Sequence, residues 1–559
     1  MRRDMFFWSA CLSIVAIVSS WPLLSAHYTV IGVDMTFHLG RIEGIYEGLL
    51  SGQFPVRVNP IQLGGYGMPT GIFYPDVFLY IPALLRLLGV PLIDCWTAFL
   101  VGINILAAFV GWWAFSTYTR SIQSGAVASL FYTVGFVRLA KLYLTMDVGE
   151  ALAWAFLPAA LVSIWVTVQR RPSYWLAAVV FSTCVFASHI LTSILLVFTT
   201  LLILAGSIRR LRANEVRWAV TKAIIFIALL NLWMYVPLFY FHDTMSYRMK
   251  GILQQEVWYK LIYPLFGFDF YIGSVLLLLV LGLAAFFAMH REKVGKDFWL
   301  LLCIGGGLLF LISHPQLWKM LGTSVGFLQA PLRLAVFPMM AASLAAGLGI
   351  GTFGLNSGRQ KGAILLLAFI MLGSNFLWLG GRPCYPIPTN IREEFDLPFM
   401  VRTSKSHIEV WPNNRYDDIT DYMEKATYDK IVRTSDDHMS ETLFREKLKD
   451  VGIHPSDRIS KFQRTGNDFR LQMEAGGAQW IQLPLFWYEG YQAVNADGAS
   501  LMIQRDDDGQ VSVWCPSSSG HVHVWYGGLS WFRITDGISF LALLGFCCIL
   551  YRKKKREDV

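Results

Sequence analysis

The chain has 559 residues, of which 55% are hydrophobic and only 15% are charged, and its mean hydropathy is +0.46. It offers repeated apolar runs of roughly 20 residues, the length that crosses a bilayer, and this predicts a polytopic α-helical membrane protein. The net charge of +8 is divided, since residues 382–532 carry 16 Lys and Arg against 22 Asp and Glu, or −6. The basic excess belongs to the membrane part, where it reflects topology, and it does not indicate nucleic acid binding.

About twelve apolar runs are predicted to span the membrane. They lie at about 6–24, 92–115, 125–143, 151–168, 174–187, 190–208, 219–241, 270–289, 298–312, 334–353, 363–379 and 534–550. The stretch 174–208 is too long for one helix and short for two, so we expect a tight hairpin at Ser188–His189.

Basic residues in short loops predict the orientation, because Lys and Arg remain on the cytoplasmic side. All such clusters fall on one side when the spans are counted: 2–3, 170–171, 209–212, 290–293, 359–361 and 552–556. Both termini are therefore expected in the cytoplasm. The predicted domains are a transmembrane module (1–381) with a long first external loop (25–91), an external β-rich domain (382–532), and a final helix with a basic tail (533–559).

The external segments carry recognisable local patterns. The first loop predicts a helix over 35–50, a Pro- and Gly-rich turn region over 55–71, and an aromatic amphipathic stretch over 74–88 that lies in the membrane interface. The outer domain predicts a helix over 440–451 and strands with hairpin turns: strands 469–473, 480–485, 500–504 and 521–525, turns 495–498 and 508–509. Cys384 and Cys515 are the two cysteines of this domain, and whether they form a disulfide stays open.

Three ionisable residues lie beyond the first span, within about two helical turns of one another: Asp34, His38 and Arg41. The i, i+4 spacing puts Asp34 and His38 on one helix face, which indicates a reaction site at the membrane surface. Asp34 is the candidate general base, and the alternative is that it caps the helix starting at Met35. His38 either orients this base or binds phosphate, or it is a polar residue in the headgroup layer.

Four more polar residues lie at the predicted outer ends of spans. Asp147 and Glu150 precede or open a helix, where the helix dipole favours an acid, although a carboxylate at the edge of the hydrocarbon tends to face a cavity. His189 is either an interhelical hydrogen-bonding residue or a site residue. Arg333 opens a span on the outer side, against the positive-inside preference.

Several features together resemble the GT-C superfamily of polyprenyl-phosphate-sugar-dependent glycosyltransferases: an acid in a long first loop, Tyr74–Pro75 before an interfacial helix, about twelve spans and a β-rich outer domain. Within it, residues 481–491 followed by Asp497–Gly498 are similar to YfhO-like bacterial membrane proteins. Residues 147–153, 188–192 and 328–333 resemble bacterial membrane proteins described as 6-pyruvoyl-tetrahydropterin-synthase-related. The resemblance implies a bacterial cytoplasmic (inner) membrane location.

The resemblance also implies a reaction, the transfer of a sugar from a polyprenyl-phosphate donor to an extracytoplasmic glycan, lipid or polymer. This transfer needs a base for the acceptor hydroxyl and positive charge for the departing phosphate. Asp34 and His38 are then the catalytic candidates, and the substrate-binding candidates are Arg41, Arg57, Tyr74, Asp147, Glu150, His189 and Arg333. The cofactor is unknown. Many GT-C enzymes have paired acids in the first loop, whereas Met35 follows Asp34, so no metal is assigned.

Two other functions remain as alternatives. A secondary transporter or lipid-carrier flippase is compatible with about twelve helices, although the halves of such transporters tend to repeat one another and this first loop has no counterpart. A non-catalytic scaffold of envelope-polymer assembly would use the outer domain for binding and would not need Asp34.

Overall fold

The computed structural model describes all residues except 1, 25–33, 248–274, 284–295, 315–316, 319, 321–327, 329–330, 352–354, 356, 381–400, 405–406, 411–422, 433–457 and 558–559. The predicted helix over 440–451 and Cys384 lie outside the described residues, as does most of the predicted span 270–289. Most of the described chain is helical, and a β-sheet region precedes the last helix.

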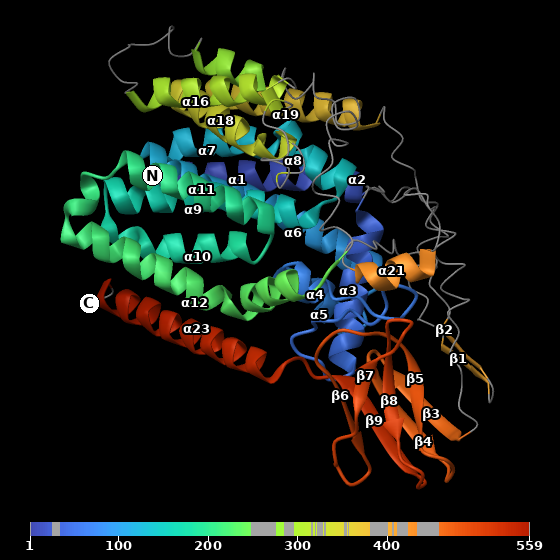
Figure 1. The fold of residues 1–559 in the computed structure, drawn as a ribbon. Coiled ribbons are helices and arrows are strands. Elements are labelled where there is room, and N and C mark those ends of the chain that lie inside the picture. The colour runs from blue at the N-terminus through green and yellow to red at the C-terminus, as the bar shows by residue number, and fades with distance from the viewer. Residues whose placement is uncertain are drawn as a thin grey trace.

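Apolar helices form most of the molecule and pack side by side in one bundle (Figure 1). They are α1 (Arg2–Ser19), α6 (Leu92–Thr119), α7 (Ile122–Thr133), α9 (Val148–Gln169), α10 (Trp175–Phe186), α11 (Ile190–Gly206), α12 (Asn214–Thr244), α16 (Lys296–Ser313), α18 (Val336–Gly351), α19 (Gly358–Gly380) and α23 (Ser530–Glu557). Shorter pieces connect them: α2 (Trp21–Leu24), α8 (Phe136–Ala140), η2 (Lys141–Thr145), η3 (Pro172–Tyr174), η4 (Arg210–Arg212) and η7 (Pro331–Leu334).

The described residues contain seven helices long and apolar enough to cross a membrane, or eight if the bent pair α7–α8 with η2 counts as one span. The chain is therefore a multi-pass membrane protein, but the predicted count of about twelve is not confirmed. α10 and α11 are apolar yet short, at 12 and 17 residues, and the chain breaks between them at 187–189, as the expected hairpin requires. The predicted span 125–143 is bent by 43° near Gly135.

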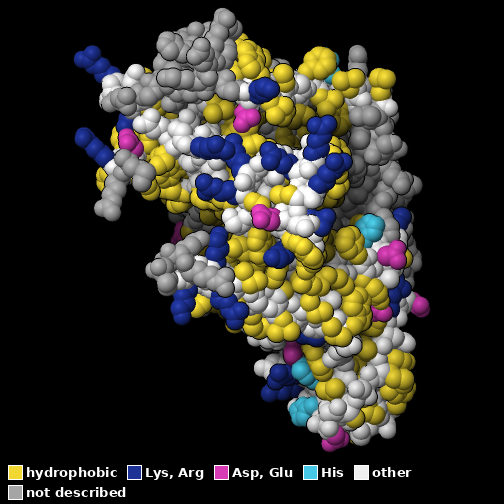
Figure 2. All heavy atoms as spheres, turned by 90° about the vertical axis from the view of Figure 1, so that its left-hand side faces the viewer, with side chains coloured by type: hydrophobic (Ala, Val, Ile, Leu, Met, Phe, Trp, Pro, Cys, Tyr) yellow, Lys and Arg dark blue, Asp and Glu magenta, His cyan; other side chains and the backbone are white. Residues whose placement is uncertain are grey.

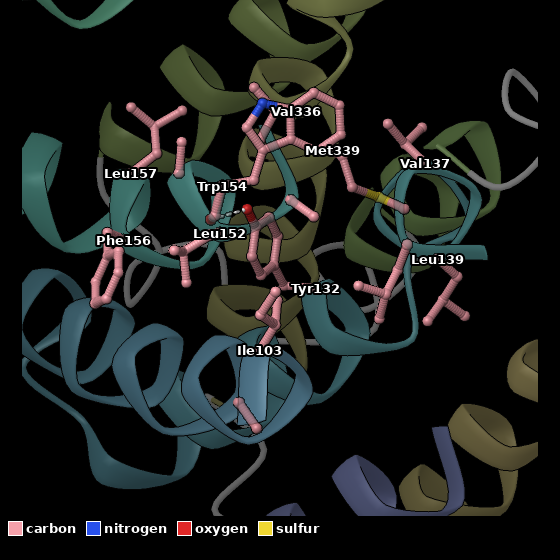
Figure 3. Close-up of a cluster of buried hydrophobic side chains, with 14 of the residues drawn as sticks. Ile103, Tyr132, Val137, Leu139, Leu152, Trp154, Phe156, Leu157, Val336 and Met339 are labelled. Carbon is pink, nitrogen blue, oxygen red and sulfur yellow. Dashed lines mark hydrogen bonds between the residues drawn. The ribbon is translucent and has the colours of Figure 1, made fainter. Parts of the chain in front are cut away.

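A dense apolar core holds the bundle together. Tyr132 and Trp154 are fully buried in it, and the Tyr132 hydroxyl donates a hydrogen bond of 2.7 Å to the Trp154 carbonyl oxygen. Figure 3 shows this bond among Ile103, Leu152 and Met339, which come from three different helices. Buried aromatic side chains contribute large apolar areas, and pairing the hydroxyl removes the cost of burying it.

The first external loop folds as the sequence predicts. α3 (Met35–Leu50) coincides with the predicted helix, and the predicted interfacial stretch forms η1 (Val77–Leu79) and α5 (Tyr80–Leu87). α5 leaves Ile81 and Leu84 about half exposed while Ala83 is buried, as expected for a helix lying in an interface.

The turn region between α3 and α5 is buried along almost its whole length and includes the single turn α4 (Thr70–Phe73). Gly71 allows a close approach here, because a Cβ atom on it would lie only 2.0 Å from the Val56 carbonyl oxygen. This region forms a compact platform on the end of the bundle.

Two antiparallel sheets share one apolar core in the C-terminal β region. Four strands pair in the order β3-β4-β9-β6 and three in the order β5-β8-β7: β3 (Ile459–Thr465), β4 (Asp468–Met473), β5 (Gln479–Phe486), β6 (Tyr491–Asn495), β7 (Ile503–Arg505), β8 (Gln510–Cys515) and β9 (Gly520–Tyr526). Their alternate residues, such as Leu471, Ile481 and Val524, fill the core. Two further pieces precede them, the pair β1 (Val401–Ser404) and β2 (His407–Val410), and α21 (Lys425–Val432).

Three of the four predicted strands coincide with β4, β5 and β9, and both predicted turns are present. Gly509, with φ +77°, adopts the left-handed conformation that the turn between β7 and β8 requires. The predicted strand 500–504 is shorter, because Leu501 still bonds to Ala493 of β6 and only 503–505 pair with β8. β3, β6 and β8 were not predicted. Cys515 is buried in β8.

The β region packs directly on the turn region of the first loop. The Phe486 amide donates to the Tyr66 carbonyl oxygen at 2.8 Å, and the Asn467 side chain donates to the Val58 carbonyl oxygen at 2.8 Å. The first loop and the β region thus form one layer at the end of the bundle, although about 400 residues of sequence separate them.

The two ends of the bundle differ in charge. Figure 1 places both chain termini at the end away from the sheets. Figure 2 looks onto that end and shows many Lys and Arg side chains there. The loops and helix ends on this side supply them: Arg120, Arg170, Arg171, Arg209, Arg210, Arg212, Arg359, Lys361 and residues 552–555. This distribution agrees with the predicted cytoplasmic placement of both termini, which stays a prediction.

Candidate active site

Buried ionisable side chains gather at the opposite end of the bundle, beneath the first loop. They come from α3, the segment before η1, η2, the start of α9, the start of α11, and η7. The sequence predicted most of them separately, and the fold brings them together.

His38 and Arg41 lie on one face of α3 and are both 1% exposed. Arg41 Nη1 lies 3.0 Å from His38 Nδ1, Arg41 Nε donates to Asp76 Oδ1 at 3.0 Å, and Nη2 donates to the Pro75 carbonyl oxygen at 2.8 Å. The guanidinium carbon also lies 4.3 Å from the centre of the Tyr74 ring. Arg41 is therefore held on four sides, which fixes the ring of His38 beside it.

The protonation of His38 follows from this contact. An arginine N–H only donates, so Nδ1 accepts and the neutral ring carries its proton on Nε2. Burial, reinforced by the charge of Arg41, lowers the pKa of His38 to about 3. His38 is thus a neutral Nε2–H donor at physiological pH. Burial also raises the pKa of Asp76, and the ion pair with Arg41 opposes this shift.

A second group of charges surrounds the start of α9. Lys141 Nζ lies 2.5 Å from Glu150 Oε2, and Arg333 Nη1 lies 3.0 Å from the same oxygen. Arg333 Nη1 also lies 3.6 Å from Asp147 Oδ2. Two cations therefore face two carboxylates. The four side chains can be buried together because each charge has a partner of opposite sign.

Asp147 has a structural and an electrostatic role. Its side chain caps α9 by accepting from the Glu150 amide at 3.2 Å. Burial alone would raise the pKa of this carboxyl, but the charges of the nearby basic side chains, including Lys141 and Arg333, outweigh burial and hold the pKa below its usual range. Asp147 therefore remains an anion within the site.

His189 connects this group to α11. Its Nδ1 lies 2.9 Å from Thr192 Oγ1 and its Nε2 lies 3.3 Å from Arg333 Nη1. Nδ1 also accepts a hydrogen bond of 3.3 Å from the Thr192 backbone amide, so the His189 side chain caps α11. Burial lowers the pKa of His189, so this ring is also neutral. Its centroid lies 6.5 Å from that of Tyr74, which stands between the two histidines.

Asp34 precedes α3 and is partly exposed. It occupies the N-cap position, yet its side chain makes no capping hydrogen bond, so the capping alternative lacks its defining contact. Its amide donates to the Thr145 carbonyl oxygen at 2.8 Å, and its carboxylate acts electrostatically on Arg333. Asp34 therefore borders the second group of charges.

Arg57 lies elsewhere. Its guanidinium pairs with Asp536 of α23 at 2.6 Å and donates to the Trp233 carbonyl oxygen of α12 at 3.2 Å. It therefore ties the first loop to two helices. The other eight predicted residues are brought together around α3 and the start of α9.

Two members of the cluster, Asp76 and Lys141, are not among the site residues predicted from the sequence. Lys141 lies near the outer end of an apolar run, the same signal that singled out Arg333. Asp76 follows the Tyr74–Pro75 pair directly. Neither position indicates its partner, because the partners are 35 and 9 residues away.

A long apolar groove has Ile190, the residue after His189, in its lining. It has a volume of about 740 Å³ and is lined mainly by α11 and α12, with further residues from α9 and α10, and it runs from Phe186 and Ile190 near the site to Leu204 near the far end. α11 is 17 residues long, so the groove follows the helix for roughly 25 Å. Its shape and lining suit a single hydrocarbon chain.

Within the described residues, no group of three or more His, Cys, Asp and Glu side chains is placed to hold a metal ion. The carboxylates that come together here face basic side chains instead.

No known protein-family description matches this sequence, and no curated protein matches it. Among solved structures, the arabinofuranosyltransferase AftD from Mycobacteria aligns over 95% of this chain and 40% of its own, with 13% identity and a TM-score of 0.45. The archaeal oligosaccharyltransferase AglB from Archaeoglobus fulgidus aligns over 69% of this chain and 57% of its own, with 13% identity and a TM-score of 0.37.

ArnT from Cupriavidus metallidurans, solved with undecaprenyl phosphate, aligns over 62% of this chain and 78% of its own, with 12% identity and a TM-score of 0.27. The chain spans 40% or less of the length of AftD. All these TM-scores are below 0.5, so the comparisons assign neither a family nor an activity to this chain.

Proposed function

We propose that this protein is a membrane glycosyltransferase of the GT-C type, which transfers a sugar from a polyprenyl-phosphate donor to an extracytoplasmic glycan, lipid or polymer. The observation that supports it is a buried, charge-compensated cluster at one end of the helix bundle, together with an apolar groove whose lining residue Ile190 directly follows His189 of the cluster. The cluster offers cations for a phosphate and carboxylates for a proton, and the groove offers room for the lipid chain.

In the proposed reaction Asp34 is the general base. It takes the proton of the acceptor hydroxyl while the acceptor oxygen bonds to the anomeric carbon of the sugar. The bond from that carbon to the phosphate oxygen breaks, and the electron pair leaves with the polyprenyl phosphate. The hydrogen bond from the Asp34 amide to the Thr145 carbonyl oxygen holds this residue beside Arg333 and Asp147.

Arg333 is the proposed partner of the phosphate. Its guanidinium already contacts Glu150, Asp147 and His189, so it is positioned before the donor arrives. Arg41 is fully engaged by Asp76 and Pro75, and its proposed role is to hold the neutral ring of His38, whose Nε2–H can donate to a phosphate or sugar oxygen. Tyr74 completes the aromatic wall between the histidines.

The groove between α11 and α12 is the proposed path of the lipid chain. Ile190 lines the groove and directly follows His189, which contacts Arg333, so a phosphate at Arg333 and a chain along α11 can belong to one molecule. Burying a hydrocarbon chain contributes about 0.8 kcal/mol per methylene, and a long lipid would gain binding energy here without any contact to the sugar.

The test is the cell-envelope glycan of a deletion strain complemented with variants. Asp34→Asn should slow sugar transfer by roughly 10² to 10⁴ at unchanged protein level, since it removes the base but keeps the shape of the side chain. Asp94→Asn is the matched control, because Asp94 is an exposed carboxylate at the start of α6. Restoration of the glycan at full rate by Asp34→Asn would refute the catalytic assignment, as expected for a non-catalytic scaffold.

A further inference from the structure

The chain between α8 and α9 departs twice from regular helix. η2 (Lys141–Thr145) is a π-helical turn, and Met146 that follows it has φ +52°, in the left-handed region. A left-handed non-glycine residue is energetically unfavourable and persists only where surrounding contacts enforce it. π-turns in proteins also occur frequently at functional sites. Contacts around η2 should therefore explain why this conformation is kept.

A buried polar network holds η2 from inside the bundle. The Tyr143 hydroxyl donates to the Ser19 carbonyl oxygen and accepts a hydrogen bond of 3.0 Å from the Asn104 amide. The same amide donates to Ser20 Oγ at 2.8 Å. Tyr143 thus ties η2 to the end of α1 and to the middle of α6.

Arg138 continues this network at the bend between α7 and α8. Its Nη2 donates to Asn104 Oδ1 at 2.6 Å, and its Nε donates to the Thr133 carbonyl oxygen at 3.0 Å. The bend deprives this carbonyl of its usual helical partner, and the guanidinium replaces that partner. In the described part of the chain no carboxylate pairs with Arg138, although it is 1% exposed. Its contacts go instead to the helix end and to the network.

On its other side η2 carries the site. Its first residue, Lys141, pairs with Glu150, and its last residue, Thr145, accepts the amide of Asp34 at 2.8 Å. Asp147 directly follows Met146. One short irregular turn therefore sets the relative positions of Asp34, Lys141 and Asp147.

We propose that Arg138, Asn104 and Tyr143 are positioning residues, which fix η2 and through it place Asp34 and Lys141 for the reaction. This inference rests on the proposed function for its catalytic consequence, but its structural part stands apart from it. None of the three touches the substrate. They act through a turn whose backbone bonds to the proposed base.

The first test measures backbone protection and does not need activity. Tyr143→Phe removes one hydroxyl and keeps the ring. In the purified full-length protein, hydrogen–deuterium exchange should rise about tenfold in peptides covering 34–40 and 141–150. Tyr132→Phe is the matched control, because Tyr132 is equally buried and also donates to a backbone carbonyl oxygen, but outside this network. It should leave both peptides unchanged.

The second test measures catalysis. Tyr143→Phe should lower kcat by about tenfold to 10²-fold with KM little changed, since a misplaced group loses transition-state contacts before it loses substrate binding. A merely structural role would lower the amount of folded protein and leave kcat per folded molecule intact. Arg138→Lys, which keeps the charge but cannot reach Thr133 and Asn104 together, should act in the same direction.

The outcomes are distinguishable. Unchanged hydrogen–deuterium exchange at 34–40 in Tyr143→Phe and Arg138→Lys would overturn the positioning role. An equal rise of exchange in the control Tyr132→Phe would also overturn it. If the wild-type protein transfers no sugar, the proposed function fails, and the exchange measurement still decides whether η2 is fixed by this network.

Discussion

The two ends of the helix bundle use the same kinds of charged residue in opposite ways. At the end with the termini, Arg171, Arg210 and the tail 552–555 are exposed. At the other end, Arg41 and Glu150 are each 1% exposed and lie within hydrogen-bonding distance of opposite charges. Exposed charges are solvated and contribute little to stability, whereas buried ones persist only with partners. Charge at the first end agrees with the predicted topology, and the buried charges at the second end make up the candidate site.

The difference is visible in single ion pairs. Arg170 and Asp297, at the basic end, lie 3.9 Å apart with Asp297 47% exposed. Lys141 and Glu150, at the site end, lie 2.5 Å apart and are 12% and 1% exposed. Removing one member of the second pair should therefore have the larger effect on stability, because water cannot solvate the buried charge that remains.

The first test of this difference is whether the two ends of the bundle face opposite sides of the membrane. Gly358→Cys at the basic end and Asp497→Cys in the turn after β6 should react with a membrane-impermeant maleimide from opposite sides, as an all-or-none effect. Both positions are exposed. Labelling of both from one side would refute the topology and with it the external placement of the site.

The next largest effect should come from removing a cation at each end. Arg333→Ala should slow sugar transfer by about 10² to 10³, the cost of removing one preorganised donor to a developing anion. Arg333→Lys should recover only part, since the planar fork is lost. Arg171→Ala at the basic end is the control, and equal activity of Arg333→Ala and Arg171→Ala would contradict the assignment.

A smaller effect concerns stability. Lys141→Met removes one of the two cations facing Glu150 and should lower the free energy of unfolding by about 3 kcal/mol, since a buried charge loses a partner. Arg217→Met, an exposed cation near the start of α12, should leave the unfolding midpoint unchanged. Chemical denaturation of the purified protein in detergent provides the measurement. Similar midpoints for the two variants would show that Glu150 is not dependent on Lys141.

The smallest effect is a pH dependence that belongs to the site end. The pKa of His38 is about 3 in the folded protein and ordinarily 6.5, so below pH 6.5 the unfolded chain binds a proton that the folded chain does not. Stability should therefore fall as the pH drops from 6.5 toward 4.5, a window above the range in which Asp147, with its lowered pKa, takes up a proton. His38→Gln should flatten this fall of the melting temperature, and His521→Gln, an exposed position, should not. An identical slope in wild type and His38→Gln would contradict the burial of a neutral ring.

Local patterns alone predicted much of the fold. The helix over 35–50, the interfacial stretch after Tyr74, the break near Ser188 and three of the β-strands follow from periodicity, Pro and Gly positions and turn residues, all of which act within about ten residues. The count of about twelve spans is not confirmed, because α10 and α11 are only 12 and 17 residues long and most of the predicted span 270–289 lies outside the described residues.

The candidate site shows the same division. Residue type and placement against the positive-inside preference identified Asp34, Asp147 and Arg333, since an ionisable group at the edge of hydrocarbon is unfavourable wherever the chain folds. The partners depended on tertiary structure: Arg57 joins Asp536 instead of the site, and Arg41 finds Asp76. These pairs form between segments 35 to 479 residues apart. The sequence therefore determined which residues need a partner, and only the packing of the helices decided which partner each one has.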